Sequence, residues 1–303
     1  MPVDNQQTDT PRLRTAERHK ILGHYLVNVT LHALLGFAHL FPYKYRIPLM
    51  GWLVSRIVAP LAGYDKRVRD NLQMVCPDLT KDVVQDLIHT VLDNSGRTLM
   101  EITSGSEFIE RARNAPVLGQ GLEDLKKATA QGKPVILVGA HFGNYDAARA
   151  KLIAMGYEIG ALYRPLRNPF FNKHYVSSIC QIGQPLFKQD RRGITQMIKY
   201  LRKGGILAAL MDLNTVDGVY MDFFQKPART SLSMAKLALK FDAVMIPVLG
   251  RRAENGLDFE ILMLPEIPHS DPVTMMQNFN QMLETHVRQD MAQWFWIHRR
   301  WKP

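Results

Sequence analysis

The sequence predicts an α/β fold with a mainly parallel central sheet flanked by helices, preceded by a helical, membrane-associating N-terminal part. From Pro116 onward, short apolar runs alternate with helical patterns, which is typical of a sheet with crossover helices. Before Pro116 the pattern is helical, and a long uncharged stretch lies near the start of the chain. We therefore divide the chain into residues 1–115 and 116–303 and expect the two parts to pack as one unit.

The composition indicates a globular protein with a positive surface. Hydrophobic residues make up 46% of the 303 residues and charged residues 22%, which excludes a disordered chain and an ordinary multi-span membrane protein. The formal net charge of +10 favours anionic partners such as nucleic acid, an acidic carrier protein or anionic lipid. Two cysteines, Cys76 and Cys180, make neither a disulfide framework nor a zinc site, and a reducing compartment suits them.

The uncharged stretch Ile21–Tyr43 follows the basic segment Arg12–Lys20. Its length would cross a bilayer, but His24, Asn28 and His32 recur every four residues and give one helix face a polar stripe. Two membrane interpretations stay open. The helix is either inserted, with its polar stripe against protein, or it lies in the interface and is held there by its basic flank. A buried helix of a soluble protein is the third interpretation.

A second apolar stretch, Ile47–Gly63, is interrupted by Arg56 and Pro60. It is too broken to span a bilayer by itself, and we expect a second helix that seeks the membrane surface.

A further helix is predicted in the N-terminal part. Thr80 is expected to cap its N-terminus, and its apolar periodicity continues to Ile109. Arg97 and Glu101 are four residues apart in this helix, so we expect them to form an ion pair on its surface or with a neighbouring helix.

The second part of the chain supplies the strands and helices of the α/β body. The predicted strands are Val135–Val138, Ile159–Tyr163, Ile206–Met211, Ala243–Leu249 and Leu257–Leu264. The predicted helices are Leu122–Ala130, Tyr145–Ala154, Phe170–Cys180, Ile194–Arg202, Ser231–Lys240 and Thr274–Arg288. Chemistry in such folds gathers where the strands end, at the carboxyl edge of the sheet.

The first of these strands leads into a polar loop that contains His141, Asn144 and Asp146. His141 and Asp146 lie five positions apart across Gly143, so the loop can fold to bring the carboxylate to one imidazole nitrogen. An imidazole that is oriented in this way can act as a general base. In the alternative interpretation, His141 caps the following helix and Asp146 serves the first turn of that helix.

Residues 139–146 resemble the H-x4-D/E motif of glycerolipid acyltransferases, in the form found in the lipid A biosynthesis acyltransferases that transfer lauroyl and myristoyl chains. Further blocks resemble the same family in the same order from Leu61 to the end: Arg69–Leu72, Cys76–Leu79, Tyr163–Pro165, Gly193–Gly204, Met211–Asp212, Val219–Phe224, Pro227–Thr230, Pro247 and Trp296–Lys302. The chain departs from the family pattern in having Gln225 where Gly is common, and Leu213–Asn214 where Gln follows the Asp.

The resemblance implies a role for each matching residue. His141 would take the proton of an acceptor hydroxyl, which then attacks an acyl thioester without an acyl-enzyme intermediate, and Asp146 would hold His141 in place. Arg164 and Arg229 would bind substrate phosphate. Asp212 would contact the acceptor or orient Arg164.

Asn144 would shape the catalytic loop. Neither a metal nor an organic cofactor is expected. We expect Phe223 and Phe224 to belong to the hydrophobic core, the interpretation that we favour over lining of an acyl pocket.

The implied protein is a membrane-bound acyltransferase on the cytoplasmic face of a bacterial inner membrane. Its donor would be acyl carrier protein, or else acyl-CoA, and its acceptor an anionic glycolipid, a lipid A precursor. Two alternatives stay open. One is an enzyme that uses acyl-CoA and acylates a mannosylated or other membrane glycerophospholipid, and the other is a catalytically silent lipid-binding or scaffold protein. A nucleic-acid partner is not expected, because no RNA-binding motif accompanies the C-terminal aromatic and basic residues.

Overall fold

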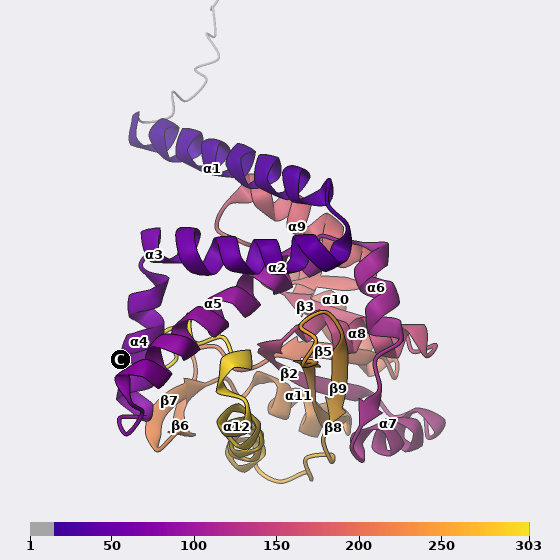
Figure 1. Cartoon of the computed structure of the whole chain (residues 1–303). Coiled ribbons are helices and arrows are strands. Elements are labelled where there is room, and N and C mark those ends of the chain that lie inside the picture. The colour runs from indigo at the N-terminus through magenta and orange to yellow at the C-terminus, as the bar shows by residue number, and fades with distance from the viewer. Residues whose placement is uncertain (1–14, 303) are drawn as a thin grey trace, which may run out of the picture.

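The computed structural model describes residues 15–302, which form an α/β architecture (Figure 1). A seven-stranded sheet of order β1-β9-β8-β2-β5-β3-β4 lies at its centre. The strands are β1 (Val117–Leu118), β2 (Val135–Gly143), β3 (Ile159–Tyr163), β4 (Leu186–Lys188), β5 (Ile206–Leu210), β8 (Val244–Arg252) and β9 (Phe259–Met263). All neighbouring strands in it are parallel except β8 and β9. The predicted mainly parallel sheet is confirmed.

Helices flank this sheet at positions close to those predicted from apolar periodicity. They are α7 (Gly121–Ala130), α8 (Tyr145–Ala154), α9 (Pro169–Ile182), α10 (Arg191–Arg202), α11 (Ser233–Phe241) and α12 (Pro272–Gln289), and a short 3-10 turn, η2 (Met291–Gln293), follows. Capping side chains mark several helix starts. Asn168 begins α9, Asp190 begins α10 and Asp271 begins α12, and each accepts hydrogen bonds from backbone N–H groups of the first turn.

The N-terminal part is helical, as expected. It contains α1 (Thr15–His39), α2 (Tyr43–Leu53), the π-helical turn η1 (Val54–Val58), α3 (Ala59–Leu61), α4 (Tyr64–Val75), α5 (Lys81–Ile102) and α6 (Ser106–Arg113). Thr80 caps α5 as predicted. The prediction that this helix continues to Ile109 is wrong, because the chain turns at Gly105, which has a φ of +57° that favours glycine, and α6 begins after it.

Two short strands outside the main sheet form a hairpin that the sequence did not predict. β6 (Val219–Phe223) pairs antiparallel with β7 (Lys226–Thr230). The connecting residues Phe224 and Gln225 both have a φ of +57°, as a two-residue hairpin turn of the primed type requires. This conformation explains why glycine suits the position of Gln225. A side chain there costs about 1–2 kcal/mol.

The N-terminal helices pack against the sheet in two hydrophobic clusters. Leu72 of α4 and Val91 of α5 belong to the same buried cluster as Ile136 of β2 and Phe279 of α12. Burying each large apolar side chain contributes about 1.5–3 kcal/mol, so this cluster binds the helical part firmly to the sheet that carries the site.

Helix α1 lies across α9 (Figure 1). The polar stripe of α1 is on the side that meets α9. His24 and Asn28 are half-buried, and the amide of Asn168 donates to the carbonyl of His24 at 2.7 Å. Large apolar side chains point outward instead, including Leu22, Leu26 and Phe37. Among the described helices, α1 has the length and apolar composition needed to cross a membrane.

Candidate active site

His141 lies near the carboxyl end of β2, where the ladder to β8 becomes irregular between Gly139 and Gly143. The strand thus continues beyond the predicted Val138. The C-terminal segment of the chain binds its backbone, since Phe295 N–H donates to the carbonyl of His141 at 3.0 Å. The His141 side chain remains 21% exposed, so a substrate can reach the imidazole.

The carboxylate that meets His141 belongs to Asp212, just beyond β5. Its Oδ1 lies 2.8 Å from Nδ1 of the imidazole, and its Oδ2 accepts the backbone N–H of His141 at 2.9 Å. The indole N–H of Trp294 also donates to Oδ2, at 3.0 Å. An ionised carboxylate can only accept, so Nδ1 is the donor in this contact, and in the neutral form of the imidazole Nε2 is the nitrogen that can accept a proton.

Electrostatics keep Asp212 ionised although its side chain is only 1% exposed. Burial by itself would raise the pKa of this carboxyl group. The opposing effects of the nearby His141 charge and of the hydrogen bonds from His141 and Trp294 are larger together, and the pKa of Asp212 lies below its usual range.

Asp146 occupies the first turn of α8, and its carboxylate has a different partner. Oδ1 accepts from Nε of Arg149 at 2.9 Å, and the guanidinium of Arg149 also donates to the carbonyls of Ile179 and Gly183. The contact ties α8 to the end of α9. The structure therefore differs from the expected His141–Asp146 hydrogen bond and shows a carboxylate that serves its own helix.

Aromatic side chains enclose the imidazole of His141. The ring of Tyr145 lies 5.1 Å from it, centroid to centroid, and that of Phe295 lies at 5.6 Å. The Tyr145 hydroxyl is 3.5 Å from that of Tyr175 on α9. Burial raises the pKa of Tyr145 well above its usual range and that of Tyr175 to about 12, so both phenols stay protonated at neutral pH.

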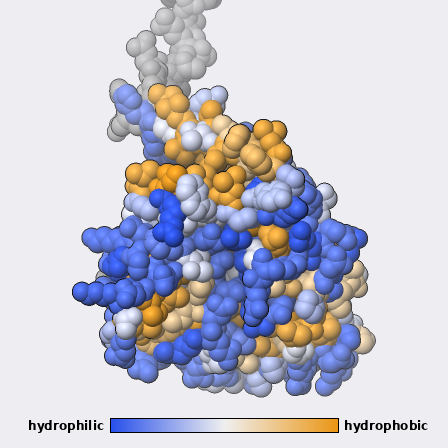
Figure 2. Space-filling view, in the orientation of Figure 1, coloured by the Kyte–Doolittle hydropathy of each residue, from blue (hydrophilic) through white to orange (hydrophobic). Residues whose placement is uncertain are grey.

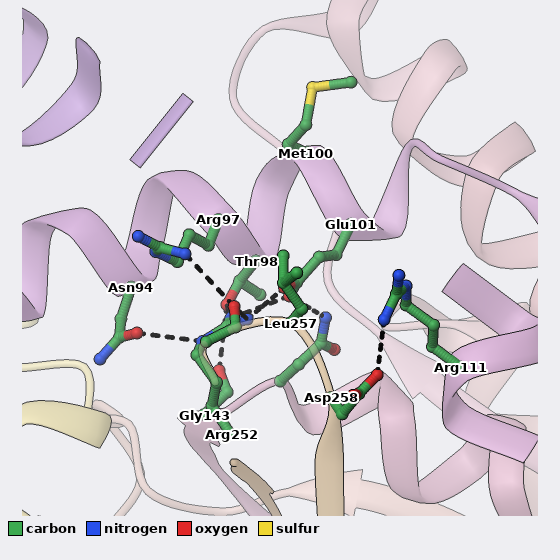
Figure 3. Close-up of polar contacts among 12 residues, drawn as sticks. Asn94, Arg97, Thr98, Met100, Glu101, Arg111, Gly143, Arg252, Leu257 and Asp258 are labelled. Atoms are coloured by element: carbon green, nitrogen blue, oxygen red, sulfur yellow. Dashed lines mark hydrogen bonds and ion pairs between the residues drawn. The ribbon is translucent and has the colours of Figure 1, made fainter. Parts of the chain in front are cut away.

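A buried polar network holds the turn that follows His141 (Figure 3). Asn144 accepts the N–H of Asp146 and donates its side-chain amide to Glu101 of α5 at 2.9 Å. Glu101 forms a buried ion pair with Arg252 of β8. Thr98 completes the network by donating to the carbonyl of Gly143 at 3.0 Å.

The prediction that Arg97 pairs with Glu101 is wrong. Arg97 pairs with Asp93 within α5, while Glu101 faces inward and pairs with Arg252 on a strand far along the chain. Helical spacing placed Arg97 and Glu101 one turn apart, but the fold brought Arg252 of β8 to Glu101 instead.

The other predicted site residues come from different elements. Arg164 follows β3 and is exposed. The strands β2, β5 and β3 are neighbours in the sheet, with His141 near the carboxyl end of β2, Asp212 shortly after β5 and Arg164 directly after β3. Arg229 lies on the β6–β7 hairpin with its guanidinium 4.9 Å from the centre of the Tyr220 ring. The oxygens of Asp212 bond to His141 and Trp294 and not to Arg164, whose orientation was one of the two roles left open for Asp212.

His298 and Arg300 in the C-terminal segment complete the surroundings of Asp212. Burial chiefly lowers the pKa of His298 to about 4, and its Nε2 accepts the backbone N–H of Asn214 at 2.8 Å. Burial also lowers the pKa of Arg300 to about 10, and its guanidinium binds the hydroxyl of Thr230 at 2.6 Å. Arg300 thereby connects the C-terminal segment to the hairpin.

Sequence reasoning missed the contribution of Trp294 to the site. Trp296 and Trp301 pack against Phe223 and Phe224, which are buried in the core as predicted. The available signal was chemical, because a buried indole N–H needs an acceptor and Asp212 is an unmatched carboxylate at a strand end.

Among residues 15–302, no cluster of three metal-ligating side chains is formed.

Comparison with known proteins places these features in a family. A family model described as bacterial lipid A biosynthesis acyltransferase matches residues 14–303. The chain is 26% identical to a lipid A biosynthesis lauroyltransferase of Escherichia coli K12, over 97% of this chain and 96% of that protein. It is 27% identical to a lipid A biosynthesis acyltransferase of Haemophilus influenzae, over 87% of this chain and 83% of the relative.

A more distant relative carries a different name. The chain is 22% identical to a phosphatidylinositol mannoside acyltransferase of Mycobacterium tuberculosis H37Rv, over 79% of this chain and 78% of that protein. The family model nevertheless covers almost the whole chain, including β2, β5 and the C-terminal segment that together build the site. The chain is therefore an acyltransferase that belongs to the bacterial lipid A biosynthesis acyltransferase family.

Proposed function

We propose that the protein transfers a fatty acyl chain from acyl carrier protein to a hydroxyl of a lipid A precursor, with His141 as the general base. The observation that carries this proposal is the hydrogen bond from Nδ1 of His141 to the buried carboxylate of Asp212. It fixes the tautomer in which Nε2 is unprotonated, and the side chain is open enough for a hydroxyl to approach.

The reaction then needs two proton transfers by the same imidazole. Nε2 takes the proton of the acceptor hydroxyl as its oxygen attacks the thioester carbonyl, and a C–O bond forms. The tetrahedral oxyanion collapses, the C–S bond breaks, and the imidazolium returns the proton to the leaving thiolate. Asp212 orients the ring and stabilises its positive charge in the interval, as an aspartate does in a catalytic triad. This sequence of steps uses neither a metal nor an organic cofactor.

Asp146 has two competing roles in this proposal. In the first it holds α8 against α9 through Arg149, and so keeps the loop of His141 in shape. In the second, which the family motif implies, it partners His141 directly. Asn144 supports the loop under either role, through Glu101 and the start of α8.

Two arginines are proposed to bind substrate phosphates. Arg164 is exposed at the end of the strand beside β5, and a guanidinium matches phosphate oxygens with two parallel hydrogen bonds. Arg229 lies on the β6–β7 hairpin, where Arg300 donates to its backbone carbonyl. An anionic glycolipid acceptor is consistent with both cations and with the formal net charge of +10.

We further propose that the enzyme works at the cytoplasmic face of a bacterial inner membrane, attached through α1. The outward apolar surface of this helix supports attachment to a membrane, and its inward polar stripe contacts α9. A lipid acceptor would be reached from that surface.

The relative from Mycobacterium tuberculosis, named a phosphatidylinositol mannoside acyltransferase, supports a mannosylated glycerophospholipid as a second candidate acceptor. In this alternative the donor would be acyl-CoA. The oriented His141–Asp212 pair argues against a catalytically silent lipid-binding or scaffold protein, since such a protein has no use for a buried carboxylate that selects one imidazole tautomer.

The decisive experiment supplies purified protein with acyl carrier protein or coenzyme A loaded with the same chain, and follows transfer to a panel of acceptor lipids by mass spectrometry. We expect transfer from the carrier protein to a lipid A precursor and a loss of about 10²–10⁴-fold for His141→Ala. Transfer by His141→Ala at the wild-type rate would refute the role of His141 as general base. Preference for acyl-CoA and a mannosylated lipid would establish the alternative.

A further inference from the structure

The segment from α2 to α3 has an apolar outer side that no described residue covers. Its inner side packs on α5 and buries Tyr43, Ile47 and Met50. The large side chains on its outer side are exposed: Tyr45 by 57%, Leu49, Trp52 by 53%, Val58 and Leu61 by 85%. A surface helix of a globular protein normally turns polar residues outward. This segment differs, because large apolar side chains lie on both its inner and its outer side.

The charges of this region match an anionic lipid surface. Between Arg18 and Tyr64 the sequence contains no aspartate or glutamate. Arg46 is buried and pairs with Glu107 of α6, whereas Lys44 and Arg56 remain exposed beside the apolar residues. Tryptophan and tyrosine flanked by cations are typical of the boundary between lipid headgroups and acyl chains.

The apolar surface also continues from this segment onto α1. Figure 2 shows hydrophobic residues gathered over α1 and the neighbouring helices, whereas the opposite end of the molecule is mainly hydrophilic in this view. Phe37 and Phe41, at the end of α1 nearest α2, are exposed and lie 5.4 Å apart between ring centroids. A surface that extends over several helices fits a bilayer better than it fits one bounded protein partner.

Hydrogen bonds connect both ends of this surface to the catalytic edge. Asn168, shortly after Arg164, donates to the carbonyl of His24 in α1. Asn71 of α4, the helix that follows α3, donates to the carbonyls of Trp296 and His298 at 2.7 and 2.8 Å. Helix α1 is therefore linked to the start of α9, and α4, which follows the α2–α3 segment, to the C-terminal segment beside His141.

We propose that the segment from α2 to α3 lies in the headgroup boundary of the membrane and forms a second lipid contact beside α1. Two contacts, unlike one, hold the body, and with it the edge that carries His141, in one orientation relative to the bilayer. The membrane contact itself does not depend on the identity of the acceptor. Its benefit for catalysis rests on the proposed membrane-embedded acceptor.

Trp52 gives a direct test with the full chain. All four tryptophans lie in the described part of the chain, and Trp294, Trp296 and Trp301 are buried, so Trp52 alone reports on the surface. On vesicles of phosphatidylethanolamine and phosphatidylglycerol we expect its emission to shift to shorter wavelength and to be quenched by bromine atoms placed on the acyl chains. Trp52→Phe is the control that should abolish both changes.

The opposite result would overturn the proposal. If the protein binds the vesicles through α1 while Trp52 keeps its aqueous emission and resists brominated lipid, the α2–α3 segment does not contact lipid. Emission changes that persist in Trp52→Phe would arise from the buried tryptophans and would refute the assignment equally.

A second experiment separates membrane contact from catalysis. Leu61→Glu should lower acyl transfer to an acceptor embedded in vesicles about tenfold relative to the same acceptor dispersed in detergent. The matched control is Val273→Glu at the start of α12, another exposed apolar residue, which should leave this ratio unchanged. An unchanged ratio in Leu61→Glu refutes the second contact. Absence of transfer by the wild type in both media would instead refute the proposed function.

Discussion

The carboxyl end of β5 and the first turn of α8 each offer one buried aspartate, and they use it differently. Asp212 bonds to the backbone and ring of His141 and to the indole of Trp294. Asp146 bonds to Arg149 three residues along its own helix. Asp146 is the nearer of the two in sequence, yet the adjacent parallel strand delivers Asp212 to the imidazole. Closeness along the chain is thus a weak guide to which carboxylate bonds to an imidazole.

Asp212→Asn should have the largest effect. An amide in this position can donate to Nδ1 and favour the wrong imidazole tautomer, so we expect kcat to fall about 10²–10⁴-fold with little change in KM. Steady-state kinetics with acyl carrier protein as donor measure the change, and a thermal melt verifies that the variant is folded. A variant that keeps a near-normal kcat would show that Asp212 has no role in the mechanism.

Asp146→Asn should mainly weaken the fold. The variant loses the ion pair with Arg149 and leaves a buried guanidinium with fewer acceptors, so we expect a loss of about 1–3 kcal/mol in the free energy of unfolding. Its kcat should fall less than tenfold. Denaturant titration and kinetics on the same sample decide between the two roles of this residue. A loss of kcat equal to that of Asp212→Asn, in a protein of normal stability, would show that Asp146 is the working partner of His141.

Trp294→Phe tests whether the C-terminal segment acts through Asp212. Phenylalanine retains much of the packing but cannot donate to Oδ2, and the loss of one hydrogen bond to a charged group should reduce kcat about tenfold. Trp296→Phe is the control, because that indole donates to the carbonyl of Met291 and not to the carboxylate. Equal kcat values for the two variants would show that Trp294 contributes only to packing.

The smallest expected effect concerns His298, on the Asp212 side of the site. Its pKa is lowered to about 4 in the folded protein, so between pH 6.5 and 4 the unfolded chain binds a proton that the folded chain does not. Stability should therefore decrease as the pH falls through this window. His298→Gln should remove on the order of 1 kcal/mol of that decrease in denaturant titrations at pH 7 and pH 5. An identical pH dependence in both proteins would contradict the buried neutral state.

The sequence by itself determined the α/β class, the five principal strands and the position of His141 at a strand end. These features follow from local rules, since apolar periodicity and capping residues act within a few positions of one another. The ordered blocks also indicated the acyltransferase family, which the comparisons confirm. The β6–β7 hairpin escaped prediction because its turn residues, Phe224 and Gln225, are not the glycine or asparagine that normally marks such turns.

Only the tertiary structure decided which groups meet. Asp212 and Trp294 lie 71 and 153 positions from His141 along the chain, and Glu101 meets Arg252 across 151 positions. Such partners are selected by the order of the strands in the sheet and by the need to pair buried charges. Neither can be read from a single sequence. The same holds for α1, whose polar stripe appeared in the sequence. Whether that stripe faced water or protein was decided by the packing of α1 on α9.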